Sequence, residues 1–471
     1  MSTADILLLA ATIIGALLLF GVTVLVHELG HFIAARWMGL YVDRFAVGMG
    51  PVAWRFKRNG VEYSIRWLPL GGFVSIPQML PMDAVEGPAA QVPKDLPAAT
   101  PWAKMVTAFF GPLFSLGLGF VLAVVIFFVG ENYNTTVATT TIGYVEKGSP
   151  AQVAGMLPGD QIIGINGEQM ESWGGSAHSI QQTLLLLTTG VANIEVERHG
   201  QRMIFAVPRQ VDANPRMEKL RTVGFENTWA KPTIVERLKK GYPAHQAGLK
   251  KGDVIKQVDG QTVYCPAQLI AMVKESSASA ALRVEFERDG VLHTVALTAQ
   301  PVAGTEEKLL GIEFKNDFYT LRYPAPLTQV QDSLDKMWRM IKALVSPQSG
   351  VGIKHMSGPL GILDLVRQLF VDWHALISFW VFFNVNLAVL NLLPLPILDG
   401  GHILFACIEG VTRRPLNIKV VNVLMTCSMV ILLLFFLMVT LNDGGRMWRN
   451  YRPSERQKAL EHSMEKIETV E

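Results

Sequence analysis

Residues 6–31 read ILLLAATIIGALLLFGVTVLVHELGH, and this stretch decides the fold class. Its uncharged part, Ile6 to Val26, is long enough at about 1.5 Å per residue to cross a hydrocarbon core of about 30 Å. The stretch then ends in His27, Glu28 and His31, and titratable side chains at a membrane segment are costly and usually mark function. A cleavable signal peptide is the alternative, but the run lacks a basic start and a small-residue cleavage site. We therefore expect a membrane helix that ends in a functional site.

The composition of the whole chain favours a membrane protein. Of 471 residues, 50% are hydrophobic and 17% are charged, with a mean hydropathy of +0.28, whereas soluble proteins carry about 25% charged residues. The formal net charge of +2 gives no electrostatic reason to expect a nucleic-acid partner. Cys265, Cys407 and Cys427 are too few and too scattered for a disulfide framework or a cysteine-based zinc site. Any metal must therefore be held by histidines and carboxylates.

Three further apolar runs have the length of a membrane span, which predicts four transmembrane helices in total. These runs are Met105 to Val129, Ala375 to Leu398 and Val420 to Leu441. Basic residues gather between the first and second runs and between the third and fourth, whereas residues 1–5 carry none. The positive-inside rule then places the N-terminus outside and the His-Glu-His cluster at the cytoplasmic side.

The tail beyond Leu441 does not fit this orientation well. An even number of crossings returns the C-terminus to the outside, yet the tail is rich in basic residues, namely Arg446, Arg449, Arg452, Arg456 and Lys458. Acidic neighbours do not cancel them, because the rule counts Lys and Arg rather than net charge. The side of the membrane on which the tail lies therefore stays open.

An internal repeat lies between the second and third runs. SPAQVAGMLPGDQIIGING at residues 149–167 returns as YPAHQAGLKKGDVIKQVDG at residues 242–260, and IEVERHG at 194–200 returns as VEFERDG at 284–290. Each copy predicts a short helix, a glycine turn, a strand and an Asn-Gly or Asp-Gly hairpin turn. Two tandem copies of one small β-rich domain are the economical interpretation.

This repeated pattern resembles PDZ domains in the arrangement found in bacterial proteases. The resemblance implies domains that bind an extended peptide as an added strand, or passive spacers that keep bulky ectodomains from the membrane. By analogy, Val223-Gly224-Phe225-Glu226 is assigned to the carboxylate loop of the second domain, with an ordinary strand start as the alternative.

The motif His27-Glu28-Leu29-Gly30-His31 has the spacing of zinc hydrolases. Two histidines four residues apart lie on one face of a helix and can ligate one zinc ion, while Glu28 lies close enough to activate a water molecule. Two histidines leave a catalytic zinc site one protein ligand short. Pro394 and Pro396 interrupt the third apolar run and are followed by Asp399 at the cytoplasmic end, at the depth of the two histidines. We expect Asp399 to be the third ligand, although a simple exit turn would have the same sequence.

Together, HELGH at 27–31, NLLPLPILDGGH at 391–402 and inserted PDZ-like domains resemble the site-2 protease family of intramembrane zinc metalloproteases, in its bacterial branch. The resemblance covers nearly the whole chain. It implies that His27, His31 and Asp399 are ligands of one catalytic zinc ion and that Glu28 is the catalytic general base.

The resemblance also implies positions that contact the substrate helix, namely Asn386, Asn391, Pro394 and Pro396. For the two asparagines, hydrogen bonding between helices is the alternative. Residues 62–74 resemble a membrane-associated β-hairpin whose edge could hold an unwound substrate. Ser357-Gly358-Pro359 matches a family motif to which we assign no chemistry, and Ser115 stands where relatives commonly carry Asn.

The expected fold is a polytopic α-helical membrane protein with four transmembrane helices, a membrane-associated β-hairpin and two inserted PDZ domains. Its expected parts are helix 1 with the HExxH motif (1–40), the hairpin region (41–104), helix 2 (105–130), the first PDZ domain (131–220), the second PDZ domain (221–303), a linker with amphipathic segments (304–373), helix 3 with the Asp ligand (374–402), a cytoplasmic loop and helix 4 (403–441), and a polar tail (442–471).

The expected function is hydrolysis of a peptide bond within or near the transmembrane segment of single-span membrane proteins, such as an anti-sigma factor or a signal-peptide remnant. The resemblance implies a substrate already trimmed by another protease, a bacterial inner-membrane location with the PDZ domains outside, and contact with membrane lipid.

Two other classes of function stay open. A membrane-anchored PDZ scaffold without catalysis would tolerate Glu28→Gln. A metal transporter would tolerate loss of Glu28 better than loss of His27, but no inverted repeat of membrane segments supports it.

Overall fold

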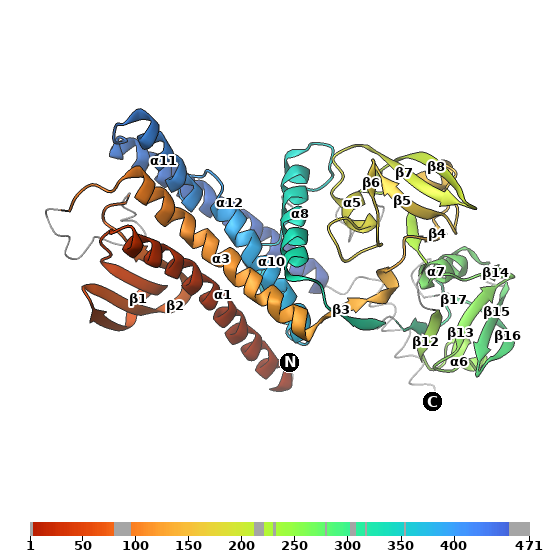
Figure 1. The fold of residues 1–471 in the computed structure, drawn as a ribbon. Helices are drawn as coiled ribbons and strands as arrows, with labels where there is room; N and C mark the ends of the chain where they lie inside the picture. The colour runs from red at the N-terminus through yellow and green to blue at the C-terminus, as the bar shows by residue number, and fades with distance from the viewer. Residues whose placement is uncertain are drawn as a thin grey trace. The chain divides into compact units, whose positions relative to one another are not determined.

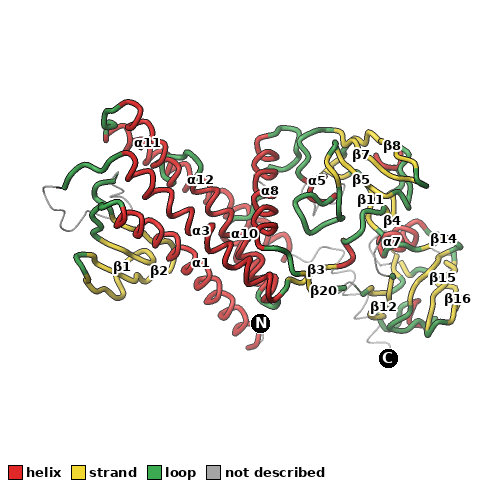
Figure 2. The backbone as a smooth tube through the Cα atoms, in the orientation of Figure 1, coloured by secondary structure: helices red, strands yellow, loops and turns green. Residues whose placement is uncertain are grey.

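A computed structural model of the chain describes residues 3–79, 96–211, 221–228, 232–277, 280–301, 308–315, 318–352 and 355–451. The chain divides into two compact units. The first comprises Met1–Glu131, Arg322–Met337 and Met356–Gly444, and the second comprises Asn132–Leu321, Trp338–His355 and Gly445–Glu471. The first unit is built mainly from helices and the second mainly from strands (Figures 1 and 2).

The described residues include four helices that are long and apolar enough to cross a membrane; three lie wholly in the first unit, and the fourth lies there up to Gly444. Among the described residues these spans are Ala10–Trp37, Pro101–Val129, Trp373–Asn391 and Ile418–Trp448. They lie in the helices α1 (Thr3–Trp37), α3 (Pro101–Val129), α10 (Trp373–Asn391) and α12 (Ile418–Tyr451). The prediction of four apolar spanning helices is confirmed in length and composition. Shorter helices are α8 (Pro326–Val345), α9 (Pro359–Leu369) and α11 (Asp399–Thr412).

Helix α3 packs against α1, α10 and α11 (Figure 1). Thr100 caps its N-terminus by accepting a hydrogen bond from the Ala103 N–H, and Pro101 occupies the first turn, where its missing N–H costs nothing. The buried positions of α3 are mostly small, including Ala108, Gly111 and Ala123. Small side chains let neighbouring helices approach closely. Membrane helices depend on such close packing, because in lipid the hydrophobic effect does not favour their association.

The third spanning helix ends earlier than the predicted 374–402. Helix α10 ends at Asn391, residues 392–398 are not helical, and Asp399 begins the separate helix α11. The prolines explain the break, because Pro394 and Pro396 lack the N–H that would continue the helical hydrogen bonds. Asp399 therefore stands at the N-terminus of a new helix rather than at the C-terminal end of the spanning one.

The last spanning helix runs further than predicted. Helix α12 continues beyond Leu441 to Tyr451, so the first part of the predicted polar tail, including Arg446, is helical. Of the basic residues in that tail, Arg452, Arg456 and Lys458 lie outside the described residues.

A β-hairpin follows α1. Strands β1 (Arg44–Arg58) and β2 (Val61–Ser75) are antiparallel, and Asn59-Gly60 joins them with positive φ at both residues, as a two-residue type I′ turn requires. One end of the hairpin packs on the end of α1 through a buried cluster that includes Ala35, Phe45 and Val74. The other end exposes apolar side chains, among them Trp54 and Trp67.

The second unit contains the two predicted β-rich copies. The first copy has the strands β4 (Ile142–Val145), β5 (Gln161–Ile165), β6 (Glu168–Gln169), β7 (Val191–Arg198), β8 (Gln201–Pro208) and β11 (Phe225–Asn227), with helices α4 (Pro150–Val153) and α5 (Ile180–Leu185). The second has β12 (Thr233–Leu238), β13 (Val254–Val258), β14 (Gln261–Thr262), β15 (Ala281–Arg288), β16 (Val291–Thr298) and β19 (Ile312–Phe314), with α6 (Pro243–Gln246) and α7 (Pro266–Glu275). The remaining elements are β3 (Glu131–Asn134), η1 (Thr135–Val137), β9 (Gln210–Val211), β10 (Arg221–Thr222), β17 (Gln300–Pro301), β18 (Lys308–Leu309) and β20 (Tyr319–Arg322). The order β6-β5-β7-β8 in one copy is repeated as β14-β13-β15-β16 in the other.

The boundary predicted between the two copies is wrong. Val223 and Phe225 are buried in the core of the first copy, and β11 pairs with its first strand, β4. The Val223–Glu226 segment therefore belongs to the first copy and not to the second. The second copy closes in the same way beyond the predicted boundary at residue 303, where β19 pairs with β12 and Gly311 repeats the positive φ of Gly224.

An Arg-Asp ion pair repeats in the two copies. Arg198 Nε lies 2.6 Å from Asp160 Oδ1, and Arg288 Nε lies 2.7 Å from Asp253 Oδ1. Burial of Asp253 opposes its ionisation, but hydrogen bonds from Arg288 and from the Lys250 N–H outweigh burial and hold the pKa of Asp253 below its ordinary value of 3.8. A carboxylate whose pKa falls on folding stabilises the folded state above the ordinary pKa, and that contribution is lost as the pH drops through the folded pKa.

We expect Asp253→Asn to lower the thermal unfolding midpoint by several degrees at pH 7 and to have a smaller effect as the pH falls below 3.8. The effect shrinks at low pH because protonation of Asp253 then removes the same negative charge from the wild type. Asp289→Asn is the matched control, because Asp289 is an exposed turn residue with positive φ, which Asn tolerates. Circular dichroism of the full chain in detergent from pH 7 to pH 3 checks this, and an equal effect of Asp253→Asn at both extremes contradicts it.

Candidate metal centre

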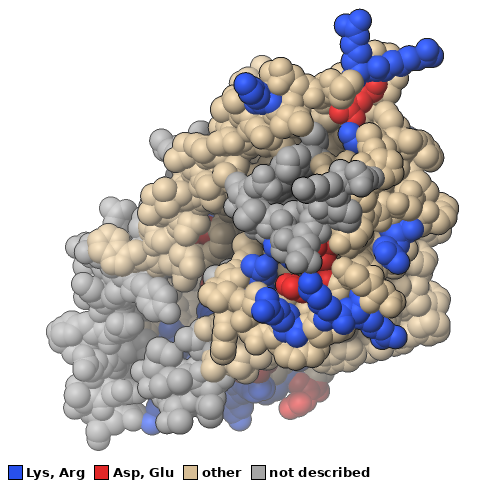
Figure 3. All heavy atoms as spheres, turned by 90° about the vertical axis from the view of Figure 1, so that its left-hand side faces the viewer, with Lys and Arg blue, Asp and Glu red and all other residues tan. Residues whose placement is uncertain are grey.

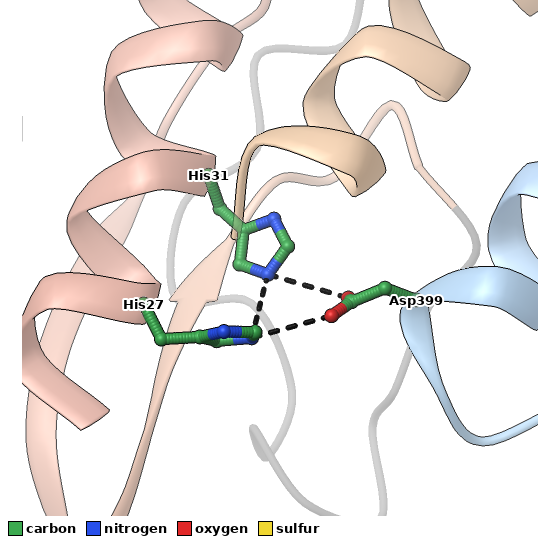
Figure 4. Close-up of side chains that lie close together, drawn as sticks. All are labelled: His27, His31 and Asp399. Carbon is green, nitrogen blue, oxygen red and sulfur yellow. Dashed lines mark hydrogen bonds and ion pairs between the residues drawn. The ribbon is translucent and has the colours of Figure 1, made fainter. Parts of the chain in front are cut away.

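Three side chains of the kinds that can ligate a metal ion meet where α1 faces the start of α11 (Figure 4). His27 Nε2 lies 3.2 Å from Asp399 Oδ2, His31 Nε2 lies 3.3 Å from Asp399 Oδ1, and the two Nε2 atoms are 3.2 Å apart. One ligand atom from each residue lies within 4.8 Å of the others. The sequence predicted these three residues as one set, and the fold brings them together from segments more than 360 residues apart.

The glycines after Asp399 let it reach the histidines. A Cβ at Gly400 would lie 2.3 Å from the Leu392 carbonyl oxygen, and a Cβ at Gly401 would lie 2.2 Å from the Leu395 carbonyl oxygen. Real Cβ atoms do not approach backbone so closely, so only glycine permits the start of α11 to pack on the non-helical segment 392–398. The packing thus requires glycine at both positions after Asp399, and this packing fixes the position of the Asp399 carboxylate.

The outer nitrogen of each histidine ring is held by α3. His31 Nδ1 lies 2.8 Å from the Thr107 carbonyl oxygen, and His27 Nδ1 lies 3.0 Å from Ser115 Oγ, where Ser115 is fully buried. A carbonyl oxygen can only accept, so His31 carries its proton on Nδ1 and turns the lone pair of Nε2 toward Asp399. Such partners orient metal-ligating histidines and raise their basicity. Two imidazole nitrogens and a carboxylate, arranged in this way, suit zinc.

Gly111 makes room for the ring of His31. A Cβ at Gly111 would lie 2.2 Å from His31 Nε2. Thr107, Gly111 and Ser115 are spaced four residues apart, which places them along one face of α3. This face of α3 therefore shapes the site, although it supplies no ligand.

A cavity of about 220 Å³ opens beside the three ligating groups. Its lining includes Glu28, which the sequence predicts as general base, and Asn391, whose Nδ2 lies 3.4 Å from His27 Nε2. Gly72 and Phe73 of the hairpin line another part of the wall. A carboxylate, two imidazoles and a second carboxylate on one small cavity can hold a cation and move a proton next to it.

Other predicted substrate-contact residues lie outside the cavity lining. Asn386 donates to the Phe382 carbonyl of its own helix, with 2.6 Å between Nδ2 and the oxygen. Pro394 is exposed and Pro396 is half-buried in the segment 392–398. Their roles toward a substrate remain predictions.

Sequence reasoning missed the contributions of Thr107, Gly111 and Ser115. The sequence marks Ser115 only as a departure from the usual Asn and indicates no partner for it. The signal was present, because the three residues recur every four positions on an apolar helix and are small or polar. Nothing in the sequence, however, indicated that this face of α3 turns toward HELGH.

Ser115→Ala is expected to weaken zinc binding about 10- to 100-fold, the usual cost of losing an outer hydrogen-bond partner of a metal-ligating histidine. Competition titration with a fluorescent zinc chelator measures this affinity directly. Ser115→Thr keeps the hydroxyl and is the matched variant, expected to bind zinc more tightly than Ser115→Ala. Wild-type affinity in Ser115→Ala would contradict a role for this hydrogen bond.

Comparison with known proteins gives one family over most of the chain. Residues 15–435 match the family described as Peptidase family M50. The regulator of sigma-E protease RseP of Salmonella typhimurium is 27% identical over 458 residues, which cover 91% of this chain and 97% of that protein. RseP of Escherichia coli is 26% identical over 454 residues, with the same coverages. A Neisseria meningitidis protein provisionally named a zinc metalloprotease is 27% identical over 456 residues, covering 91% of this chain and 98% of its own length.

A solved PDZ domain from Listeria monocytogenes matches 20% of this chain and 96% of its own chain, at 15% identity and a TM-score of 0.18. This match is local, and its TM-score is too low to support an argument about the fold.

Proposed function

The chain belongs to peptidase family M50 and is an intramembrane zinc metalloprotease, and from this premise we propose that His27, His31 and Asp399 hold one zinc ion while Glu28 is the general base. The observation that carries the proposal is the convergence of the three ligating groups on a cavity that Glu28 also lines. When bound, zinc supplies Lewis-acid chemistry, polarising a peptide carbonyl and making water more acidic.

Glu28 moves the proton in this proposal. Its carboxylate accepts a proton from the attacking water and passes that proton to the nitrogen of the leaving amine. His27 and His31 keep their Nε2 atoms toward the ion, because Ser115 and the Thr107 carbonyl hold their Nδ1 atoms. Asp399 is held in place by the packing of Gly400 and Gly401.

The substrate is a membrane protein, and we propose a single-span protein whose outer domain has been trimmed by another protease. A transmembrane helix buries its peptide groups in its own hydrogen bonds, so a segment must unwind before it is cut. The hairpin supports this step, because residues 72–75 pair with β1 on one edge, no further strand pairs with them in the described part of the chain, and Gly72 and Phe73 line the cavity. An unwound peptide can add to that free edge. Asn386, Asn391, Pro394 and Pro396 are proposed to contact the same segment.

We propose a bacterial inner-membrane location with the metal site toward the cytoplasm and two PDZ-type copies outside. Lys and Arg side chains are prominent on the face of the molecule seen from the hairpin side (Figure 3), and Arg55, Lys57 and Arg58 of the hairpin are exposed. Basic residues favour the cytoplasmic side. Exposed Trp54 and Trp67 beside them suit a hairpin that enters the lipid interface.

The test uses the purified full chain in detergent and a single-span substrate with a short outer domain. We expect one zinc ion per chain by elemental analysis, cleavage that stops on addition of 1,10-phenanthroline, and recovery on adding zinc. The same substrate fused to a folded outer domain is the matched control and is expected to be cut more slowly. A well-folded wild type that holds no zinc and cuts neither substrate would remove the proposal and favour a PDZ scaffold.

A further inference from the structure

His402 is a polar side chain of the metal-site cavity that the roles above leave unused. It lies in the first turn of α11, three residues after Asp399, so the two side chains project from the same side of the helix. It lines the same cavity as Glu28. His402 is therefore placed where a bound peptide would pass.

The ring of His402 has an N–H that nothing described in the protein accepts. In either tautomer an imidazole carries at least one N–H donor. His27 and His31 direct their outer nitrogens to Ser115 and to the Thr107 carbonyl. The backbone N–H of His402 donates to the Leu398 carbonyl, whereas no side chain or backbone group in the described ranges hydrogen-bonds to its ring. Because the ring is only half-buried and lines the cavity, its N–H is open to a molecule bound there.

His402 does not belong to the group of ligating atoms. Within the described residues that group consists of His27, His31 and Asp399. His402 thus stands beside the ligands, with its donor free for a second molecule. A peptide unwound from a transmembrane helix brings carbonyl oxygens that have lost their own hydrogen bonds, and such oxygens are the natural acceptors.

We propose that His402 is a further catalytic residue, whose ring N–H donates a hydrogen bond to the carbonyl oxygen of the scissile peptide bond. This inference rests on the proposed function of the site. That oxygen gains negative charge as the peptide carbon becomes tetrahedral, and a fixed donor in a cavity with little water stabilises the charge more than bulk water does. His402 holds its proton throughout and neither gains nor loses it.

The test compares His402→Phe with His402→Gln in the zinc-loaded full chain. His402→Phe removes the donor, and kcat is expected to fall about 100- to 1000-fold, as on loss of one oxyanion donor, with KM and zinc content close to those of the wild type. His402→Gln keeps an N–H and is expected to recover part of the loss. His374→Gln is the matched control, because His374 lies in the first turn of α10 and does not line the cavity.

A binding measurement separates a transition-state role from a structural one. By calorimetry, His402→Phe is expected to bind a tetrahedral phosphinic peptide more weakly, by a factor similar to its loss in kcat/KM. The uncut substrate, measured in a Glu28→Gln background, is expected to bind equally with and without His402.

Three outcomes would overturn the inference. The first is a wild-type kcat in His402→Phe. The second is a loss of zinc from this variant in parallel with its activity. The third is a rise in its KM at unchanged kcat, which would indicate that His402 contributes to ground-state binding only. Failure of the proposed function is distinguishable from all three, because the wild type itself would then neither hold zinc nor cut the substrate.

Discussion

Glu28→Gln is expected to reduce the turnover number about 100- to 10,000-fold while zinc content stays at the wild-type level. The range is that of a lost general acid–base group. Gln has nearly the same volume as Glu but cannot accept a proton from water. Glu28 lines the cavity and is not one of the three grouped ligating residues, so its replacement leaves the ion in place. Single-turnover cleavage of the single-span substrate, with elemental analysis of the same sample, measures both quantities.

A second variant tests the position of the carboxylate. Glu28→Asp keeps the acid and shortens the side chain by one methylene, so its activity should lie between those of Glu28→Gln and the wild type. Turnover by Glu28→Gln at the wild-type rate would remove Glu28 from the mechanism. Loss of zinc in Glu28→Gln would instead place Glu28 in the construction of the metal site.

Gly111→Ala is expected to lower zinc affinity and cleavage together, with a loss in zinc affinity at least as large as the 10- to 100-fold typical of losing an outer partner of a metal-ligating histidine. The added Cβ would lie 2.2 Å from His31 Nε2 and 2.3 Å from His31 Cε1. The ring has little freedom to retreat, because its Nδ1 is bonded to the Thr107 carbonyl on the same helix. Its ligating nitrogen must therefore turn away from Asp399.

Gly117→Ala in the same helix is the matched control. A Cβ at Gly117 meets no atom within 4 Å, and Ala is favoured over Gly inside a helix by about 1 kcal/mol. Gly117→Ala should therefore fold, bind zinc and cut substrate like the wild type. Full zinc binding in Gly111→Ala would mean that α1 and α3 can separate enough to admit a methyl group.

Local patterns in the sequence predicted most of what lies along the chain. The apolar runs predicted the spanning helices, and the repeated Gly-Asp and Asn/Asp-Gly turns predicted two β-rich copies. His27, His31 and Asp399 were predicted as one set because two histidines at helical spacing need a third ligand at the same depth. The spanning helices and the two copies are confirmed, and the three side chains do lie together, because each inference depends on residues close together or on a simple rule about membrane depth. The role of the three side chains as zinc ligands stays a prediction.

The errors and omissions concern contacts between distant segments. The sequence assigns Val223 and Phe225 to the wrong copy, because the pairing of β11 with β4 joins residues about eighty positions apart and leaves no local pattern. The sequence indicates no partner for Ser115, because the rotation of α3 against α1 is set by packing along the whole helix pair. The apolar run predicts a longer helix than α10, because its composition stays apolar through the segment 392–398 in which Pro394 and Pro396 prevent a helix.

The four-residue spacing of Thr107, Gly111 and Ser115 also limits how the chain can change in length. Each residue advances a helix by about 100°, so deleting one residue between Thr107 and Ser115 would rotate one of them to another face of α3. The hydrogen bond between His27 and Ser115 and the hydrogen bond between His31 and the Thr107 carbonyl could then no longer form together. Deletions in this eight-residue interval should thus be far more damaging than deletions of equal size in the exposed turn at Asn59-Gly60, which touches no part of the metal site.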